Sequence, residues 1–131
     1  SSQSPKQMRV DRTVISALAE LQDEGSVEFI SELIEMFGES TPKEIKSMQK
    51  ALKAQDGKAL AGIAHSLKSS SGNLGAMLFR DQCRRLETYA RKEHWAKCKV
   101  VIKKVESEID LTMTALREEL EELKKADKKA A

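Results

Sequence analysis

Residues 58–75 read KALAGIAHSLKSSSGNLG, and the helix they predict carries both a core face and a candidate site. At about 100° per residue, a helix centred on Leu67 also places Leu60, Ile63, Ala64, Ser71 and Leu74 within roughly 60° of that centre. The period therefore predicts an amphipathic helix with one buried face. Gly75 follows where a tight turn is expected, since glycine readily adopts the backbone conformation that ends a helix.

His65 lies about 160° from the buried centre of this helix and is expected to face solvent. Residues with very small side chains surround it on the outer face, namely Ala61, Gly62, Ser69 and Gly72. A solvated helix face normally carries Glu, Lys, Gln or Arg, and each glycine costs about 1 kcal/mol of helix stability relative to alanine. Packing within the domain does not compensate for this cost on a solvated face. The small side chains around His65 therefore indicate close approach by another macromolecule.

The side chains at this face suggest anion chemistry. A protruding neutral imidazole is a nucleophile and a proton-transfer group near physiological pH. Lys68, one turn beyond His65, is placed to put an ammonium beside an anion bound there. A lone surface histidine is usually incidental, and His94, which has no small neighbours, is interpreted in that way. The bare surroundings of His65 favour a functional role instead.

The same three- and four-residue spacing of apolar side chains predicts helices on both sides of this segment. It runs from Val10 to Leu21, from Phe29 to Phe37, from Phe79 to Ala90, and from Trp95 to Leu123. Within residues 26–55, Thr41-Pro42-Lys43-Glu44 has the composition of a helix-capping box, which leaves open whether this region forms two helices or one kinked helix.

The last stripe is the longest, at about 30 residues or ~45 Å of helix. Its surplus turns are expected either to project into solvent or to pack as a coiled coil. Short connections favour antiparallel neighbours, so the chain is predicted to be all-α, an antiparallel up-and-down four-helix bundle with an additional N-terminal helix and a long C-terminal helix. Residues 9–124 form this domain, residues 1–8 are interpreted as a disordered tail or tag remnant, and residues 125–131 as a polar C-terminal tail.

Composition sets limits on function. The 131 residues are 40% hydrophobic and 34% charged, which is typical of one globular domain. The 23 Lys and Arg against 21 Asp and Glu give a net charge of only +2 with the signs interspersed, which argues against a nucleic-acid binder. No apolar stretch approaches the ~20 residues that a membrane helix needs, and the basic residues are not gathered as on a membrane-surface helix. The chain is therefore expected to be cytoplasmic, with no direct membrane contact.

No cofactor or metal is expected. Cys83 and Cys98 lie 15 residues apart without a metal-binding or redox motif, and we interpret them as reduced core residues. The chain has no glycine-rich phosphate loop for ATP. It also lacks the clustered carboxylates that hold Mg²⁺ in phosphoryl-transfer enzymes.

Residues 64–76, AHSLKSSSGNLGA, strongly resemble the motif of histidine-containing phosphotransfer (HPt) domains. The His-x-Leu-Lys core with a glycine ten residues after the histidine is specific, and the resemblance covers about residues 10–110. Phe37, the break at Asp56, and Cys83-Arg84-Arg85-Leu86-Glu87 followed by Arg91 match the family as well. Ser69 departs from it, because the family usually has glycine there, but serine is still small.

The resemblance implies a four-helix bundle whose exposed histidine accepts phosphate from an aspartyl phosphate on a receiver domain and passes it to another receiver. Nε2 of His65 would attack, Lys68 would stabilise the added charge, and the small residues would admit the receiver. The receiver would supply Mg²⁺, so the domain is expected to be a phosphoryl carrier and no autonomous enzyme. Its expected parent is a hybrid sensor histidine kinase, of which it would be the C-terminal module.

On the same resemblance, the helix after Gly75 pairs antiparallel with the His65 helix. Arg80, Arg84, Glu87 and Arg91 form one polar stripe there, by steps of four, three and four. Glu87 lies 12 residues after Gly75 and His65 lies 10 before it, so the two are expected to be nearly level. The family often has Gln at the position of Glu87. A carboxylate would repel phosphate, and the expected alternatives are that Glu87 orients the unmodified imidazole or pairs with Arg91.

The competing interpretation is a helical adaptor or coiled-coil scaffold, in which His65 is incidental and residues 94–123 make the contacts. A scaffold does not explain a bare helix face around one histidine. The sequence therefore favours the phosphotransfer interpretation.

Overall fold

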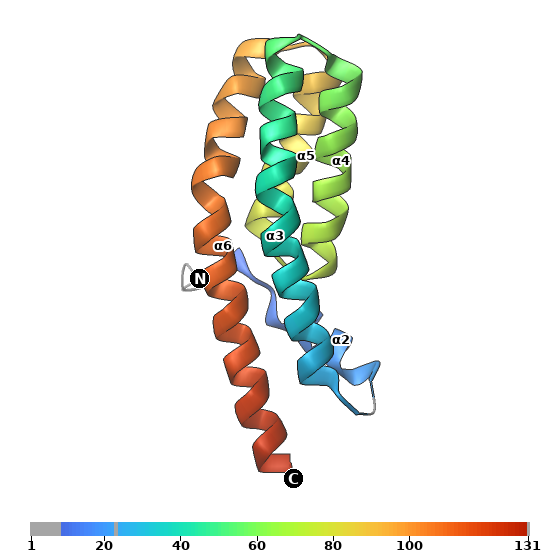
Figure 1. The fold of residues 1–131 in the computed structure, drawn as a ribbon, viewed down its shortest axis with the longest axis vertical. Coiled ribbons are helices and arrows are strands. Elements are labelled where there is room, and N and C mark those ends of the chain that lie inside the picture. Colours follow the sequence, from blue (N-terminus) through green and yellow to red (C-terminus); the bar gives the residue numbers. More distant parts are fainter. Residues whose placement is uncertain (1–8, 23, 131) are drawn as a thin grey trace.

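The computed structural model describes residues 9–22 and 24–130, and the predicted all-α fold is confirmed (Figure 1). The helices are α2 (Arg12–Glu20), α3 (Ser26–Lys53), α4 (Gly57–Asn73), α5 (Met77–Arg91) and α6 (Trp95–Ala130). The interpretation of residues 1–8 as a tail or tag remnant lies outside the described residues. None of the helices described is long and apolar enough to cross a membrane.

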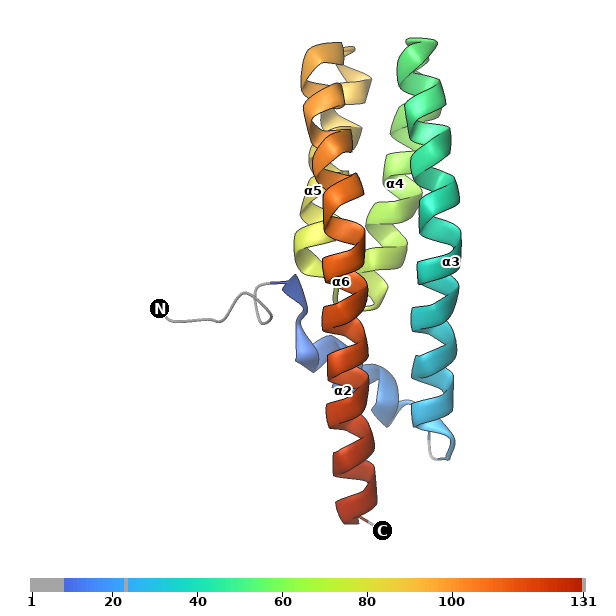
Figure 2. The ribbon, with the colours of Figure 1, turned by 60° about the vertical axis from the view of Figure 1, so that its left-hand side comes forward.

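Helices α3 to α6 run side by side, each antiparallel to the next, and form the bundle. Helix α2 crosses between α3 and α6, beyond the ends of α4 and α5 (Figures 1 and 2). The core between the four long helices is apolar, with Phe37 and Phe79 in edge-to-face contact at 5.6 Å between ring centroids. The predicted buried face of α4 is largely confirmed, because Leu60, Ala64, Leu67 and Ser71 are buried while Ile63 is half-buried.

Helix α3 is continuous across Pro42, which settles the alternative left open for residues 26–55 in favour of one helix. The capping interpretation of Thr41 is therefore wrong, because Thr41 is fully buried inside the helix. Phe37, Thr41 and Ile45 keep helical spacing on the buried face on both sides of the proline. Burial of this stripe offsets the backbone hydrogen bond that an interior proline removes.

Helix α6 extends beyond the ends of α4 and α5, where α2 and α3 cover it. Its apolar stripe stays buried as far as Leu120, and Leu123 is half-buried. Glu119 of α6 accepts a hydrogen bond from Arg12 of α2 at 3.3 Å, and Arg117 pairs with Glu35 of α3 at 2.9 Å. The surplus turns as far as Leu123 therefore pack against α2 and α3 of the same domain and form no separate coiled coil, whereas residues 124–129 are exposed. Helix α6 continues to Ala130, so most of the predicted polar tail is helical.

The turn between α4 and α5 is fixed by the segment before α2. Gly75 has φ +79°, and a Cβ there would lie 2.7 Å from the carbonyl oxygen of Asp11. The backbone N–H of Asp11 donates to the carbonyl of Gly75 at 2.8 Å. Glycine is required at this turn for its backbone conformation and for the close approach, and the turn sets the register of the α4–α5 hairpin.

Candidate functional site

The site lies on the α4–α5 hairpin. Helix α4 begins after Asp56, whose side chain accepts a hydrogen bond from the backbone N–H of Ala59 at 3.0 Å and so caps the helix. From this start the helical period directs Leu67 into the core and His65 outward, where 58% of the His65 side chain is exposed. The sequence-based placement of His65 on the outer face agrees with the structure.

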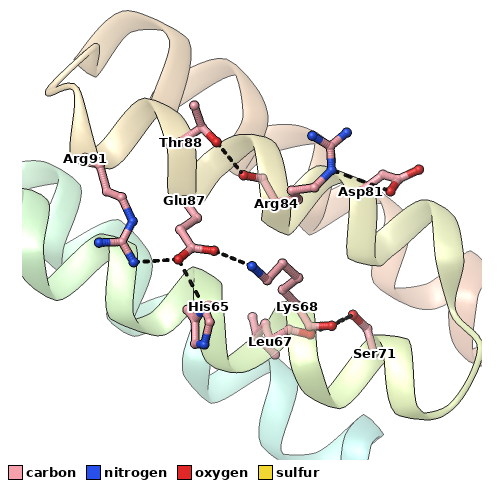
Figure 3. A network of polar contacts seen from close by, with 9 residues as sticks. All are labelled: His65, Leu67, Lys68, Ser71, Asp81, Arg84, Glu87, Thr88 and Arg91. Atoms are coloured by element: carbon pink, nitrogen blue, oxygen red, sulfur yellow. Dashed lines mark hydrogen bonds and ion pairs between the residues drawn. The ribbon is translucent and has the colours of Figure 1, made fainter.

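His65 contacts α5 through one ring nitrogen (Figure 3). Its Nδ1 lies 3.0 Å from Oε2 of Glu87, a carboxylate whose side chain is only 10% exposed. The predicted level pairing of His65 with Glu87 across the hairpin is therefore found. Of the two alternatives expected for Glu87, contact with the imidazole and pairing with Arg91, the structure shows both.

Glu87 is the centre of a four-residue cluster (Figure 3). Its Oε1 accepts a hydrogen bond from Nζ of Lys68 at 2.8 Å, and its Oε2 accepts one from Arg91 at 2.6 Å as well as facing His65. Lys68 lies on α4 and Arg91 on α5, so the carboxylate joins the two helices. With a neutral imidazole, the two cations leave this cluster one net positive charge.

The surroundings of Glu87 keep it ionised. Burial by itself would raise its pKa, but hydrogen bonds from Lys68 and Arg91, together with the charges of Lys68 and His65, outweigh burial. The net effect lowers the pKa of Glu87 from 4.5 to about 2. Near neutral pH, Glu87 is therefore an ionised carboxylate, which can only accept hydrogen bonds.

This acceptor sets the tautomer of the neutral ring. Because Oε2 of Glu87 has no proton to donate, Nδ1 of His65 carries the N–H, and the lone pair of the neutral imidazole is on Nε2. Nε2 lies on the opposite edge of the ring from the contact with Glu87. The site therefore offers one nucleophilic nitrogen on a largely exposed side chain.

The small residues predicted around His65 differ in their actual exposure. Gly62 and Ser69 are exposed, and a Cβ on Gly62 would meet nothing within 4 Å. Gly72 is half-buried, because Arg80 lies over it, and a Cβ there would lie 3.0 Å from Cδ of Arg80. Gly72 lies three residues before Gly75 and Arg80 five after it, the same offset of two that makes His65 level with Glu87, so chain distances from this turn also predict the contact of Arg80 with Gly72.

The prediction that Ala61 belongs to the outer face is wrong, because Ala61 is only 3% exposed. Helices α4 and α5 approach closely at this end, where a Cβ on Gly57 would lie 2.8 Å from the backbone oxygen of Ala90. The helical period placed Ala61 away from the buried centre of α4, but a calculation on one helix takes no account of the neighbouring helix α5. Ala61 is therefore a contact between helices.

Open hollows flank the outer face of α4. One of about 540 Å³ is lined in part by Lys58, Gly62 and Arg91, between α4 and α5. Another of about 470 Å³, between α3 and α4, is more apolar and is lined in part by Met36 and Ser70. The outer face of α4 is therefore bordered by one hollow toward α5 and another toward α3.

Arg84, predicted to flank the site, and His94, predicted to be incidental, both lie apart from the cluster around Glu87. Arg84 pairs with Asp81 at 3.9 Å along α5 and is not in the Glu87 network (Figure 3). His94 is exposed before α6, and its ring packs near Tyr89 at 6.4 Å between centroids. Among the residues that the structure describes, no group of His, Cys, Asp and Glu is arranged to hold a metal ion.

Comparisons with known proteins agree with this geometry. The family model of the Hpt domain matches residues 32–126. The "Multistep phosphorelay regulator 1" of Schizosaccharomyces pombe is 35% identical over 80 residues, which are 61% of this chain and 27% of that protein. The "Histidine-containing phosphotransfer protein 2" of Arabidopsis thaliana is 29% identical over 104 residues, covering 77% of this chain and 67% of that protein.

A solved structure gives the same result. Histidine-containing phosphotransfer protein B (HptB) from Pseudomonas aeruginosa PAO1 superposes with a TM-score of 0.77 at 27% identity, over 92% of this chain and 98% of that one. The chain therefore belongs to the Hpt domain family, and it shares the fold of this solved structure. Its function class is histidine phosphotransfer in a multistep phosphorelay.

Proposed function

We propose that His65 is the residue of this domain that carries the phosphoryl group. Nε2 attacks the phosphorus of an aspartyl phosphate on a receiver domain, the Nε2–P bond forms, and the P–O bond to the aspartate breaks so that its carboxylate leaves. Transfer to a second receiver is the same step in reverse. The observation that carries this proposal is the contact of Nδ1 with Glu87, because it leaves the Nε2 lone pair for attack on an exposed ring.

Lys68 and Arg91 supply positive charge to the same reaction. Both contact Glu87, at 2.8 and 2.6 Å, and both keep some exposure, with 30% and 63% of their side chains accessible. Their remaining N–H groups can face a phosphoryl group on His65. Hydrogen bonds from these cations to phosphate oxygens are charge-assisted and therefore stronger than neutral ones. Arg84, which pairs with Asp81, has no part in this role.

The receiver docks on the outer face of α4 in this proposal. Gly62 and Ser69 present little side chain on either side of His65, whereas Gly72 is less accessible because Arg80 lies over it. A receiver reaches the imidazole over Gly62 and Ser69 without displacing bulky groups. The near-attack distance that phosphoryl transfer needs depends on this access.

The domain is a carrier, and its receivers supply the catalytic chemistry. Mg²⁺ and the aspartyl phosphate belong to the partner, while this chain contributes the nucleophile, its orientation and two cations. The sequence-based expectation of a C-terminal module of a hybrid sensor kinase is kept as part of this proposal. The relatives named above are called phosphotransfer proteins and a phosphorelay regulator, which supports a carrier role whether the domain is part of a kinase or a separate protein.

The free, buried thiols of Cys83 and Cys98 support a reducing compartment such as the cytoplasm.

The scaffold alternative has less support. It needs an apolar stripe on α6 that remains open to a partner, but the stripe is buried as far as Leu120 by contacts within the domain. Among the described residues of α6, the large apolar side chains that are exposed are those of Val100 and Leu111, which lie about three turns apart.

The test is transfer from a phosphorylated receiver to the purified domain. The expected product is an acid-labile, base-stable phosphoryl group on the domain, as a phosphoramidate bond requires. The His94→Gln variant is the matched control, because it removes the other histidine and leaves the Glu87 cluster intact. Normal acceptance by His94→Gln together with loss in His65→Gln supports the proposal, and labelling by ATP and Mg²⁺ alone would contradict the carrier role.

A further inference from the structure

Glu87 is anchored before any partner arrives. Lys68 holds Oε1 at 2.8 Å, while Arg91 holds Oε2 at 2.6 Å beside the ring of His65. Because the carboxylate is largely buried and is held by groups from two helices, its position does not depend on the imidazole. A phosphoryl group on Nε2 also leaves the Nδ1 edge of the ring free, so the contact with Glu87 persists in the phosphorylated state.

That persistence matters for the charge of the phosphorylated ring. A ring that bears phosphorus on Nε2 and a proton on Nδ1 is a cation, and a carboxylate 3.0 Å from Nδ1 stabilises it. When the phosphoryl group leaves, the Nε2–P bond breaks and its electron pair returns to Nε2. The ring then departs as neutral imidazole, with the Nδ1 proton still shared with Glu87. Without that proton the ring would depart as imidazolate, which is a far poorer leaving group.

We infer that Glu87 is a positioning residue that keeps the phosphorylated ring of His65 protonated on Nδ1, and so makes this domain a fast donor of phosphate rather than a store. The inference rests on the function proposed above and names the property of the site that sets the lifetime of the phosphoryl group. Lys68 and Arg91 are the charged groups that contact Glu87, and they weaken its field at the ring without removing the hydrogen bond.

The lifetime of the phosphohistidine tests this directly. The wild type and Glu87→Gln are labelled with phosphoramidate, a small phosphoryl donor that needs no receiver, and hydrolysis is followed from pH 5 to 10. The neutral amide stabilises the cationic ring less, so the change from fast to slow hydrolysis is expected to move about one pH unit toward acid. Near pH 8 the lifetime of the variant is then about tenfold longer, and transfer to a receiver is slower by a similar factor.

Control variants separate this effect from a structural one. Glu121→Gln makes the same chemical change at an exposed pair with Lys124 and is expected to leave the profile unchanged. Glu87→Asp restores the charge and is expected to return the profile part of the way to the wild type. Identical profiles for the wild type and a folded Glu87→Gln overturn the inference.

Two further measurements test the role of Glu87 separately from the proposed relay function. Phosphoramidate labelling of a wild type that accepts nothing from any receiver would contradict the proposed relay function, while the lifetime profile would still decide the role of Glu87. The ¹⁵N spectrum of His65 in the unmodified wild type is independent of the variants. A ring protonated on Nδ1 is the expected result, and a ring protonated on Nε2 alone would overturn the inference.

Discussion

Oε2 of Glu87 lies 3.0 Å from Nδ1 of His65, across the two helices of one hairpin. This pairing selects Nε2 as the nitrogen that remains available for phosphorus. It also brings Lys68 and Arg91 beside the ring, because the same carboxylate binds both. Orientation of the nucleophile and the placement of positive charge are therefore two consequences of one buried side chain.

Glu87→Gln is expected to lower stability near neutral pH by about 1 to 3 kcal/mol, because the folded state holds the ionised carboxyl with two cations. Since folding lowers the pKa of Glu87 from 4.5 to about 2, its contribution is fully present above pH 4.5 and is lost as the pH falls toward 2. Urea unfolding of both proteins across this range measures the difference. Glu35→Gln, at an exposed ion pair, is the control and is expected to change little. A difference for Glu87→Gln that stays constant down to pH 2 would contradict the ionic origin.

Lys68→Ala is expected to leave His65 able to accept phosphate but to shorten the phosphohistidine lifetime by about fivefold. This factor corresponds to about 1 kcal/mol for one partly exposed charge-assisted contact. The direction is opposite to that expected for Glu87→Gln, because one variant removes a cation and the other an anion. Decay of the labelled proteins in parallel samples measures both. An unchanged lifetime in Lys68→Ala would assign this lysine to the structural pairing with Glu87 alone.

Ser69→Gln is expected to separate stability from function. Ser69 is exposed one turn from His65, and Gln is the better helix former by a few tenths of a kcal/mol, so melting is expected to stay equal or rise slightly. The longer side chain stands in the path of the receiver, and loss of near-attack geometry lowers the transfer rate by on the order of 100-fold. Calorimetry and a transfer time course on the same preparation measure the two effects. Normal transfer by the folded variant would remove the explanation of the small residues by close approach.

Two glycine substitutions are expected to act in opposite directions. Gly75→Ala places a Cβ at φ +79° and 2.7 Å from the carbonyl oxygen of Asp11, so stability is expected to fall by about 2 kcal/mol or more. Gly62→Ala adds a methyl group to an exposed helix position with nothing within 4 Å, and stability is expected to rise by about 1 kcal/mol. Thermal unfolding of both variants measures this, and equal effects of the same sign would contradict the account of the turn.

The periodicity of apolar residues predicted most of this fold. The stripe on α6 from Cys98 to Leu120 is buried almost residue for residue, because the helix period gathers its apolar side chains on one face and that face packs against the core. The continuity of α3 was not predictable in the same way. Thr41 and Pro42 carry the local pattern of a helix start, and only packing of the stripe against the rest of the core decides for one helix.

The candidate site shows the same division. His65 and Glu87 were placed level from chain distances to Gly75, because an antiparallel hairpin makes sequence separation a measure of height. The burial of Ala61 and the covering of Gly72 by Arg80 depend on how closely α4 and α5 approach. The period of one helix does not give the distance to its neighbour. The shared use of Glu87 by three partners likewise depends on side-chain geometry across two helices.

The most direct test of the account is the position of the phosphoryl group. The ¹⁵N-labelled domain is phosphorylated by a receiver, and the ³¹P coupling to the ring nitrogens is then measured by NMR. The account predicts phosphorus on Nε2 of His65, with Nδ1 still protonated toward Glu87. Phosphorus on Nδ1 of His65, on His94 or on no histidine would contradict it.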